Sequence, residues 1–324
     1  MSKLYIIIQT ELSCSLIIKM LYLKYWTSLI GSVRKMTTAI DKSSLSKLRK
    51  KTGFSFINCK NALLQFENDL VKAEGWLKEQ AQKEGWAKAT KLQSRPMSQG
   101  LVGLRTNPDN TSATLIEVNC ETDFVARNQK FVDLVTTLTT VCNNHFTSFN
   151  NKKISLEKED VNLIVSSDGR TIGDLVAYEV GNIGENMALR RAVHMMTSSN
   201  TTISTYVHVS GDEINVSENC QLGKYGTIVE FERLENEDKT LYLVADPFHV
   251  KQQICQHIVG LNPKTVGSED DEPVSNKDEE TMLIYQEFLT DPTILVKDVL
   301  KENCLIVKDF IRFECGERLP GEDL

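Results

Sequence analysis

The sequence predicts an α+β protein, with an N-terminal bundle of three short helices followed by two related α+β subdomains that each contain a small antiparallel sheet. Three observations predict this fold. Apolar residues recur at helical spacing in three short runs between residues 44 and 85. A strand, turn, strand and helix pattern begins at residue 100. A similar pattern returns about a hundred residues later.

These patterns set the expected domain boundaries. The helical domain is expected at residues 43–90, with a linker to residue 99 that contains Arg95-Pro96. The first core subdomain is expected at residues 100–200 and the second at residues 201–324. Residues 1–42 form a segment of different composition.

Polar residues mark the ends of the three short helices. Ser44 and Ser55 are expected to cap the first two helices, and Gly53 to end the first. Asn68 or Asp69 is expected to begin the third. About forty residues bury little apolar surface, so this bundle is expected to be loosely tethered or completed by a partner.

The first subdomain is predicted from a hairpin and a helix. Residues 100–104 and 113–119 are strand-like and flank the turn residues 107–110. A helix follows whose apolar face is formed by Phe131, Leu134, Val135, Leu138 and Cys142. A second helix is expected to start at residues 184–186 and to run through Arg190-Arg191.

The second subdomain repeats this order. Strands are expected at residues 205–209, 225–232 and 241–244, with a helix through Val250, Ile254, Ile258 and Leu261. An acidic run at residues 267–280 is interpreted as a solvated loop. A helix at residues 293–302 and a strand at residues 306–314 are expected to close the chain. Residues 310–313 do not alternate strictly, which suggests that one face of this last strand is crowded.

The charge is unevenly distributed along the chain. Residues 1–42 contain six basic and two acidic residues and carry a net charge of +4, so the remaining 282 residues carry −11 of the total of −7. A basic head rich in Ser, Thr, Leu, Ile and Tyr is typical of a mitochondrial transit peptide; a secretory signal is the competing interpretation. Its apolar runs are shorter than the roughly 18–20 residues that cross a membrane. The acidic remainder disfavours broad nucleic-acid binding.

The motifs of common enzymes are missing from the sequence. It contains no phosphate-binding GxxxxGK[ST] loop, no GxSxG, no HExxH, no EF-hand loop and no GxGxxG after a strand. The eight cysteines form no CxxC pair, and buried, reduced thiols are expected. His194, His208 and His257 lie far apart in the sequence and are expected to be packed or surface residues. No catalytic residue, metal site or cofactor is therefore predicted.

One segment joins a predicted strand to a predicted helix and has two interpretations. In residues 118–128, Thr122 or Asp123 could be a helix cap, with Phe124 as a core anchor. Alternatively, the segment could have a functional role of its own. The residues of this segment alone favour the first interpretation.

Four motifs, in order along the chain, resemble those of the elongation factor Ts family. They are Leu48-Arg49-Lys50-Lys51-Thr52-Gly53 with Asn58-Cys59-Lys60-Asn61-Ala62-Leu63, then Thr122-Asp123-Phe124-Val125-Ala126, then Gly184-Glu185-Asn186 with Arg190-Arg191, and finally Phe310-Ile311-Arg312-Phe313-Glu314-Cys315-Gly316-Glu317. The resemblance covers residues 44–317 and implies a ubiquitin-associated-like helical domain before two homologous subdomains. The short, acidic region 260–285 takes the place of a long helical hairpin in the bacterial family, as in the mitochondrial branch. Asn58 replaces the usual Asp of the family, and Phe56-Ile57 stand where the family has paired Met.

The resemblance also implies a function and its residues. A member of this family is a non-enzymatic exchange factor that releases GDP from elongation factor Tu, here in the mitochondrial matrix, without cofactor, small-molecule substrate, membrane or direct nucleic-acid contact. Asp123 and Phe124 would be the intruding pair, with Phe124 wedged between helices of the GTPase and Asp123 near its Mg²⁺. The helical domain would dock through Arg49, Phe56 and Ile57, and Ile183 and His208 would be further contacts.

Two other functions remain open at this point. The helical domain could recognise ubiquitin or a nascent chain, with the core as a scaffold. The chain could also be an unrecognised enzyme, although no clustered acid, base, nucleophile or metal ligand supports this.

Overall fold

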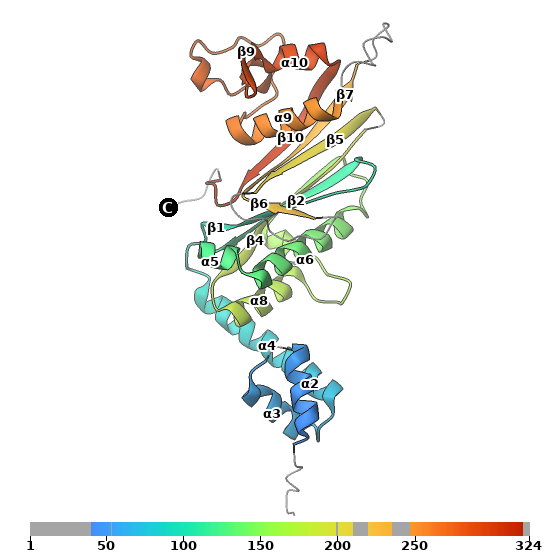
Figure 1. The fold of residues 1–324 in the computed structure, drawn as a ribbon, viewed down its shortest axis with the longest axis vertical. Helices are drawn as coiled ribbons and strands as arrows, with labels where there is room; N and C mark the ends of the chain where they lie inside the picture. The colour runs from blue at the N-terminus through green and yellow to red at the C-terminus, as the bar shows by residue number, and fades with distance from the viewer. Residues whose placement is uncertain (1–39, 53, 199, 210–219, 235–246, 320–324) are drawn as a thin grey trace, which may run out of the picture. The chain divides into compact units, whose positions relative to one another are not determined.

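The computed structural model describes residues 40–52, 54–198, 200–209, 220–234 and 247–319. The chain divides into two compact units, residues 1–79 and residues 80–324. The predicted transit peptide and the predicted strand at residues 241–244 lie outside the described residues, apart from residues 40–42. The fold is α+β, as the sequence predicts (Figure 1).

The N-terminal unit is built from α2 (Lys42–Thr52), α3 (Phe56–Gln65) and the start of α4 (Leu70–Leu92). Its core contains Leu45, Leu48, Cys59, Ala62, Leu63, Ala73 and Leu77. The Ser55 side chain accepts a hydrogen bond from the Asn58 amide, which confirms the predicted cap of α3. Asp69 accepts from the amides of Val71 and Lys72 at the start of α4.

One predicted cap is wrong. The carboxylate of Asp41 accepts hydrogen bonds from the amides of Ser43 and Ser44, so Asp41, and not Ser44, caps α2. These hydrogen bonds, together with those from the two serine hydroxyls, lower the pKa of Asp41. An ionised carboxylate is a stronger acceptor than a hydroxyl for the unpaired amides of a first turn, which explains the choice.

Helix α4 is longer than predicted, because it continues through residue 92 and shortens the linker to residues 93–98. Its C-terminal part packs against α8 (Ile172–Ile183) at a very close approach. A Cβ on Gly85 would lie 2.2 Å from the carbonyl oxygen of Ala177. Lys88 donates to the Gly181 carbonyl at 2.7 Å, and Trp86 donates to Asp174 at 2.9 Å.

In the part of the chain that the structure describes, the first sheet has five strands in the order β3-β4-β2-β1-β6, all antiparallel. These are β3 (Lys153–Glu157), β4 (Met187–Met196), β2 (Ser112–Cys120), β1 (Gln99–Thr106) and β6 (Gln221–Gly223). One face is covered by α6 (Gln129–Phe146) and α8, which share a core with strands β1 and β2. The short helices α5 (Asp123–Ala126) and α7 (Lys158–Val161) lie at its ends.

Within the described residues, the second sheet has three strands in the order β10-β7-β5. These are β10 (Leu305–Glu314), β7 (Tyr225–Arg233) and β5 (Thr201–His208). Helices α9 (Pro247–Leu261) and α10 (Val296–Glu302) share an apolar core with this sheet. The hairpin of β8 (Glu287–Phe288) and β9 (Asp291–Leu295) and the 3-10 turns Lys277–Glu279 and Leu283–Tyr285 complete it.

The two sheets pack against each other through a separate apolar cluster. The first sheet contributes Val102, Leu104, Ala113, Leu115, Val193 and Met195, and the second Ile203, Val207, Ile228 and Phe313. The second unit is therefore layered as helices, sheet, sheet and helices (Figure 1). Strand β6 joins the first sheet, although the sequence placed its residues with the second subdomain.

The helix expected from residue 184 through Arg191 is instead a strand. Gly184 ends α8 in the left-handed conformation, with φ of 91°, and β4 begins three residues later. Because β4 is central in its sheet and buried on both faces, it lacks the alternation of a half-exposed strand and can be mistaken for a helix. Helix α8 was not predicted, although Thr171 and Asp174 form a capping box at its start.

The histidines and most of the described thiols are packed as expected, whereas Cys304 and Cys315 are only half-buried. Cys59, Cys120, Cys142, Cys220 and Cys255 are buried free thiols, and Cys14 lies outside the described residues. Burial raises the pKa of Cys142 and of Cys255 to about 12, so neither is reactive at neutral pH. His194 and His257 are buried and hydrogen-bonded to Thr114 and Gln286, whereas His208 is exposed.

The close approach of α4 and α8 leads to a stability prediction. We expect Gly85→Ala to lower the free energy of unfolding by about 1–3 kcal/mol, because the new methyl group would collide with backbone. Gly75→Ala on the same helix is the matched control, since no atom lies within 4 Å of a Cβ there. It should raise stability by about 0.5–1 kcal/mol through helix propensity. Urea denaturation measures both, and equal effects of the two variants would contradict the packing.

Candidate functional site

The segment after β2 forms a sharp corner, residues 121–124, between the sheet and the short helix α5. The hydroxyl of Thr122 caps α5 by accepting a hydrogen bond from the Val125 amide at 3.3 Å. This confirms the predicted cap at Thr122. The predicted alternative, in which Phe124 is a core anchor, is wrong, because the Phe124 side chain is 82% exposed.

The single turn of α5 exposes the Phe124 side chain and buries the two side chains that follow it. Val125 and Ala126 are 6% and 3% exposed and belong to the core of the first sheet. Since successive residues of a helix are rotated by about 100°, anchoring these two side chains inward directs the preceding one outward. The exposed ring is therefore a consequence of the anchored residues that follow it.

Asp123 stands beside this ring. Its carboxylate is about half exposed and lies 3.4 Å from the guanidinium of Arg127, one turn later in the chain. The Arg127 side chain is also largely exposed. An ion pair in this setting contributes about 0–1 kcal/mol, so the Asp123 carboxylate can change partners at little cost.

The turn between α8 and β4 holds the corner through two opposed interactions. The hydroxyl of Thr122 lies 3.0 Å from one carboxylate oxygen of Glu185, to which it donates. In the reverse direction, the amide of Asn186 donates to the carboxylate of Glu121 at 2.6 Å. The segment after β2 thus supplies the Glu121 carboxylate to the turn before β4, and that turn supplies the Glu185 carboxylate to the corner. We call these two contacts the corner clamp.

A third segment supports the clamp. The side-chain amide of Asn186 donates to the carbonyl of Arg95 at 3.0 Å, and the Arg95 guanidinium lies 3.3 Å from Glu121. Residues far apart in the sequence therefore fix the position of the corner from two sides. Hydrogen bonds to charged groups are shorter and stronger than neutral ones, which favours a single geometry.

The structure brings Ile183 close to this corner but not His208. Ile183 is the last residue of α8, directly before the clamp turn, and packs partly buried on the first core. His208 ends β5 in the second sheet, where its ring nitrogen lies 3.3 Å from the Tyr206 hydroxyl.

His208 borders a groove of about 610 Å³ on the second sheet. The lining residues are Tyr206, His208, Tyr225, Gln256, Val259, Gly260, Leu289, Arg312 and Glu314. The rings of His208 and Tyr225 have centroids 6.0 Å apart. The lining combines aromatic side chains with Arg312 and Glu314, and aromatic residues and arginine are enriched in protein-contact surfaces.

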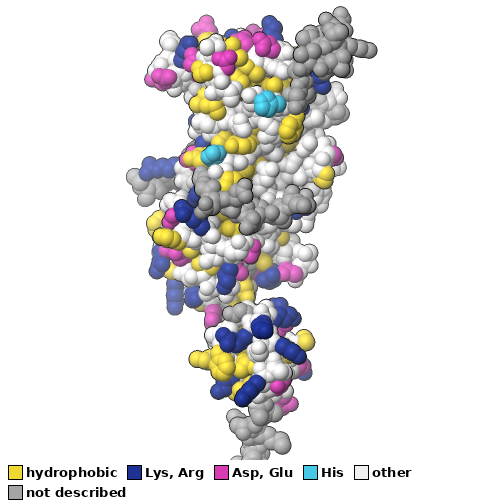
Figure 2. Space-filling view, in the orientation of Figure 1, with side chains coloured by type: hydrophobic (Ala, Val, Ile, Leu, Met, Phe, Trp, Pro, Cys, Tyr) yellow, Lys and Arg dark blue, Asp and Glu magenta, His cyan; other side chains and the backbone are white. Residues whose placement is uncertain are grey.

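The remaining predicted site residues lie in the N-terminal unit. Arg49 is exposed in the last turn of α2, and Phe56 and Ile57, 50% and 66% exposed, begin α3. In the space-filling view, this unit shows apolar side chains bordered by basic ones (Figure 2). A three-helix unit that leaves large apolar side chains in water has surface available for a partner.

Comparison with known proteins identifies the family. A family model described as "Elongation factor Ts, mitochondrial, N-terminal" matches residues 28–87, and one described as "Elongation factor TS" matches residues 121–278. The chain is 41% identical over 298 residues to elongation factor Ts, mitochondrial, of Aedes aegypti, covering 90% of this chain and 94% of the relative.

The chain belongs to the elongation factor Ts family. Relatives from Branchiostoma floridae and Xenopus laevis, also called mitochondrial elongation factor Ts, are each 42% identical to it. The matches cover 86% and 88% of this chain and 90% of each relative. Membership of this family supports a role in translation elongation. The match that begins at residue 121 includes both the corner and the clamp turn.

The residues of the corner clamp were missed in the sequence. Glu121, Glu185 and Asn186 are polar residues in two family motifs, and nothing local shows that the motifs meet, since Thr122 and Glu185 are 63 residues apart. The signal was present in the Gly-Glu-Asn turn, which was interpreted as the start of a helix. Glycine is strongly enriched just after the end of a helix and only modestly at the start of one.

The described part of the chain shows no arrangement for metal chemistry. Among the described residues, no three His, Cys, Asp or Glu side chains are grouped so that they could hold a metal ion. Beside the corner, burial raises the pKa of the Cys120 thiol to about 12. None of the described helices has both the length and the apolar character needed to cross a membrane.

The double role of the Thr122 hydroxyl gives a prediction. Thr122→Val keeps the shape of the side chain but removes both the cap and the donor to Glu185. We expect it to lower the free energy of unfolding by about 1–3 kcal/mol, whereas Thr122→Ser should lose less than about 1 kcal/mol.

Urea denaturation measures the difference, and amide hydrogen exchange at Val125 reports it locally. Faster exchange in the Val variant than in the Ser variant is the expected result. Equal stability and equal exchange in the two variants would show that the clamp contributes nothing to the corner.

Proposed function

We propose that the protein is a guanine-nucleotide exchange factor of translation elongation in the mitochondrial matrix. In this proposal it binds elongation factor Tu carrying GDP and promotes GDP release by disturbing the Mg²⁺–phosphate site, which allows GTP to load. Its action is non-catalytic in the sense that it makes and breaks no covalent bond. Family membership, the names of the mitochondrial relatives and the geometry of the corner support this proposal.

The observation that carries the proposal is the exposure of Phe124 on a fixed corner. A benzyl side chain that is 82% exposed, next to two anchored residues, retains nearly all of its surface for a partner. Burying a ring of this size contributes roughly 1.5–3 kcal/mol. Because the corner is already formed, little ordering entropy is lost when Phe124 enters a cleft.

Asp123 supplies charge at the same place. On docking, its carboxylate would exchange the weak pair with Arg127 for groups near the bound Mg²⁺. A negative charge there repels phosphate oxygens and competes with the oxygen ligands of the cation. Phe124 would thus provide the wedge and Asp123 the electrostatic perturbation.

Exchange follows from thermodynamic linkage. An exchange protein of this kind binds the nucleotide-free GTPase more tightly than the nucleotide-bound GTPase. By linkage, its binding weakens the affinity of the GTPase for nucleotide by the same ratio. The remaining contacts, through Arg49, Phe56 and Ile57 on the helical unit and through Ile183 and His208 on the core, would supply binding energy without touching the nucleotide. In this proposal the factor itself holds no cofactor, metal ion or small-molecule substrate; the Mg²⁺ and the nucleotide belong to the GTPase.

Replacement of the wedge tests the proposal. We expect Phe124→Ala to slow GDP release from mitochondrial elongation factor Tu by at least about tenfold, which corresponds to about 1.4 kcal/mol. Release is followed with fluorescent GDP in a chase by unlabelled nucleotide, with the factor in catalytic amounts.

The matched control is Leu163→Ala, which removes an apolar side chain that is 73% exposed elsewhere on the first subdomain. This variant should exchange nucleotide as the wild type does. Unchanged release with Phe124→Ala, while the wild-type factor is active, would remove Phe124 from the mechanism. If the wild-type factor has no effect on release, the proposed function itself is wrong.

A further inference from the structure

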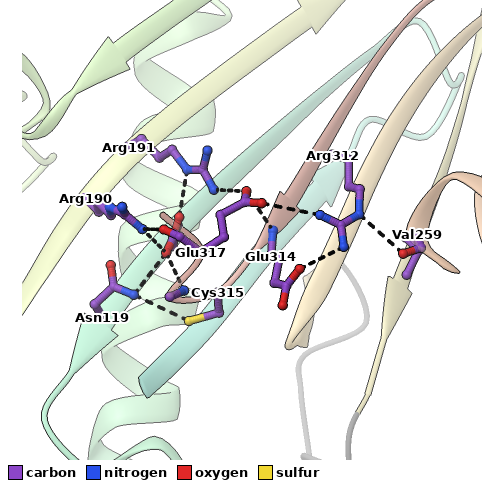
Figure 3. A network of polar contacts seen from close by, with 10 residues as sticks. Asn119, Arg190, Arg191, Val259, Arg312, Glu314, Cys315 and Glu317 are labelled. Atoms are coloured by element: carbon purple, nitrogen blue, oxygen red, sulfur yellow. Dashed lines mark hydrogen bonds and ion pairs between the residues drawn. The ribbon is translucent and has the colours of Figure 1, made fainter. Parts of the chain in front are cut away.

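A buried ionic network connects the strand that carries the corner with the second sheet (Figure 3). Its centre is Glu117 on β2, which has no exposed surface. One carboxylate oxygen accepts from Arg190 at 3.1 Å and from the amide of Gly316 at 2.8 Å. The other oxygen accepts from Arg191 at 2.7 Å.

A β-bulge explains how two consecutive arginines reach the same carboxylate. In a regular strand, Arg190 and Arg191 would point to opposite faces. In β4, however, Glu117 pairs with Arg191 and Val118 with Leu189, so Arg190 is the extra residue of the bulge. A bulge re-aims the side chains beside it, and here both guanidinium groups contact Glu117.

Glu317 extends the network toward the second sheet. Its backbone carbonyl accepts from Arg190 at 2.7 Å, and its carboxylate accepts from Arg191 at 2.6 Å. The second carboxylate oxygen lies 3.4 Å from Arg312 on β10. Arg312 also donates to Glu314 and to the Val259 carbonyl in α9, and its side chain is 7% exposed.

The network therefore joins the two regions that would contact the GTPase. At one end, Glu117 lies on the strand that leads into the corner at residues 121–124. At the other end, Arg312 and Glu314 line the groove that His208 borders. Three carboxylates and three guanidinium groups balance in charge across the path (Figure 3).

Ionic contacts restrict the joint between the sheets in a way that the apolar cluster does not. Apolar packing between the sheets is non-directional and tolerates small rotations and sliding. Guanidinium–carboxylate contacts have defined directions, and a rotation that broke one would leave a buried charge without its partner. The network thus selects one angle between the sheets.

We propose that Glu317 and Arg312 are positioning residues that fix the angle between the two sheets, so that the corner and the His208 groove engage one GTPase at the same time. This inference rests on the proposed exchange function. Loss of the angle would still permit docking through either region alone. It would prevent Phe124 from entering its site while the groove is occupied.

The experiment measures GDP release from mitochondrial elongation factor Tu over a range of concentrations of the full-length factor. Glu317→Gln removes one charge from the network. Glu302→Gln, at an exposed carboxylate at the end of α10, is the matched control for the change in charge. Arg312→Lys is a second variant that keeps the charge but replaces the planar guanidinium, whose three nitrogens reach Val259, Glu317 and Glu314, with a single ammonium nitrogen that cannot span these positions.

We expect Glu317→Gln and Arg312→Lys to lower the maximal release rate by at least about fivefold, while the factor concentration at half-maximal rate changes less than about threefold. A merely structural role gives the opposite pattern, because a smaller folded fraction raises the apparent half-maximal concentration and leaves the maximal rate unchanged. When Phe124→Ala is already present, adding Glu317→Gln should not lower the maximal release rate further, because both changes affect the entry of the Phe124 ring into the GTPase.

Maximal rates equal to wild type in both variants would overturn the inference, as would effects that multiply with that of Phe124→Ala. Thermal unfolding of each variant shows whether it is folded at the assay temperature. If Glu317→Gln is unfolded there, the maximal release rate of Arg312→Lys tests the inference. Failure of this inference is distinguishable from failure of the proposed function, because wild type and Glu302→Gln would still accelerate release.

Discussion

The arrangement of this protein depends on the mutual clamp between the end of β2 and the turn before β4. Glu121 accepts the amide of Asn186, and Glu185 accepts the hydroxyl of Thr122, so neither segment can move without breaking a contact of the other. This constraint makes an exposed aromatic useful. A ring on a mobile loop would lose conformational entropy on binding, whereas a ring on a clamped corner has lost most of it already.

The rest of the core unit supports that corner. Strand β2 is buried along its whole length and pairs with β1 on one side and β4 on the other. Helices α6 and α8 cover one face of its sheet, and the second sheet covers the other. Strand β2 thus ends at the surface after crossing the best-packed part of the molecule. The ionic network around Glu117 adds direction to this packing, because apolar contacts alone do not fix an angle.

Local patterns in the sequence were sufficient for elements that turn residues or a helical period mark. The hairpin of β1 and β2, helix α6 and helix α9 follow from turn residues and periodicity. Elements whose environment is set by distant residues were not predictable in this way. Strand β4 is buried on both faces. Strand β10 also packs on both faces, with Phe310 against the core shared with α9 and Phe313 between the two sheets, which explains the broken alternation of residues 310–313. The exposure of Phe124 was expected only from the resemblance, and the clamp that causes it joins segments about sixty residues apart.

The central claim is that Phe124 enters the GTPase when nucleotide leaves. Its most direct test places a photo-crosslinking benzoylphenylalanine at position 124 of the full-length protein and irradiates it with mitochondrial elongation factor Tu. The account predicts a crosslink to the nucleotide-free GTPase that excess GDP with Mg²⁺ suppresses, and no comparable crosslink from the same residue placed at position 163. Crosslinking from position 124 that is absent, or that is unaffected by the nucleotide, would contradict the account.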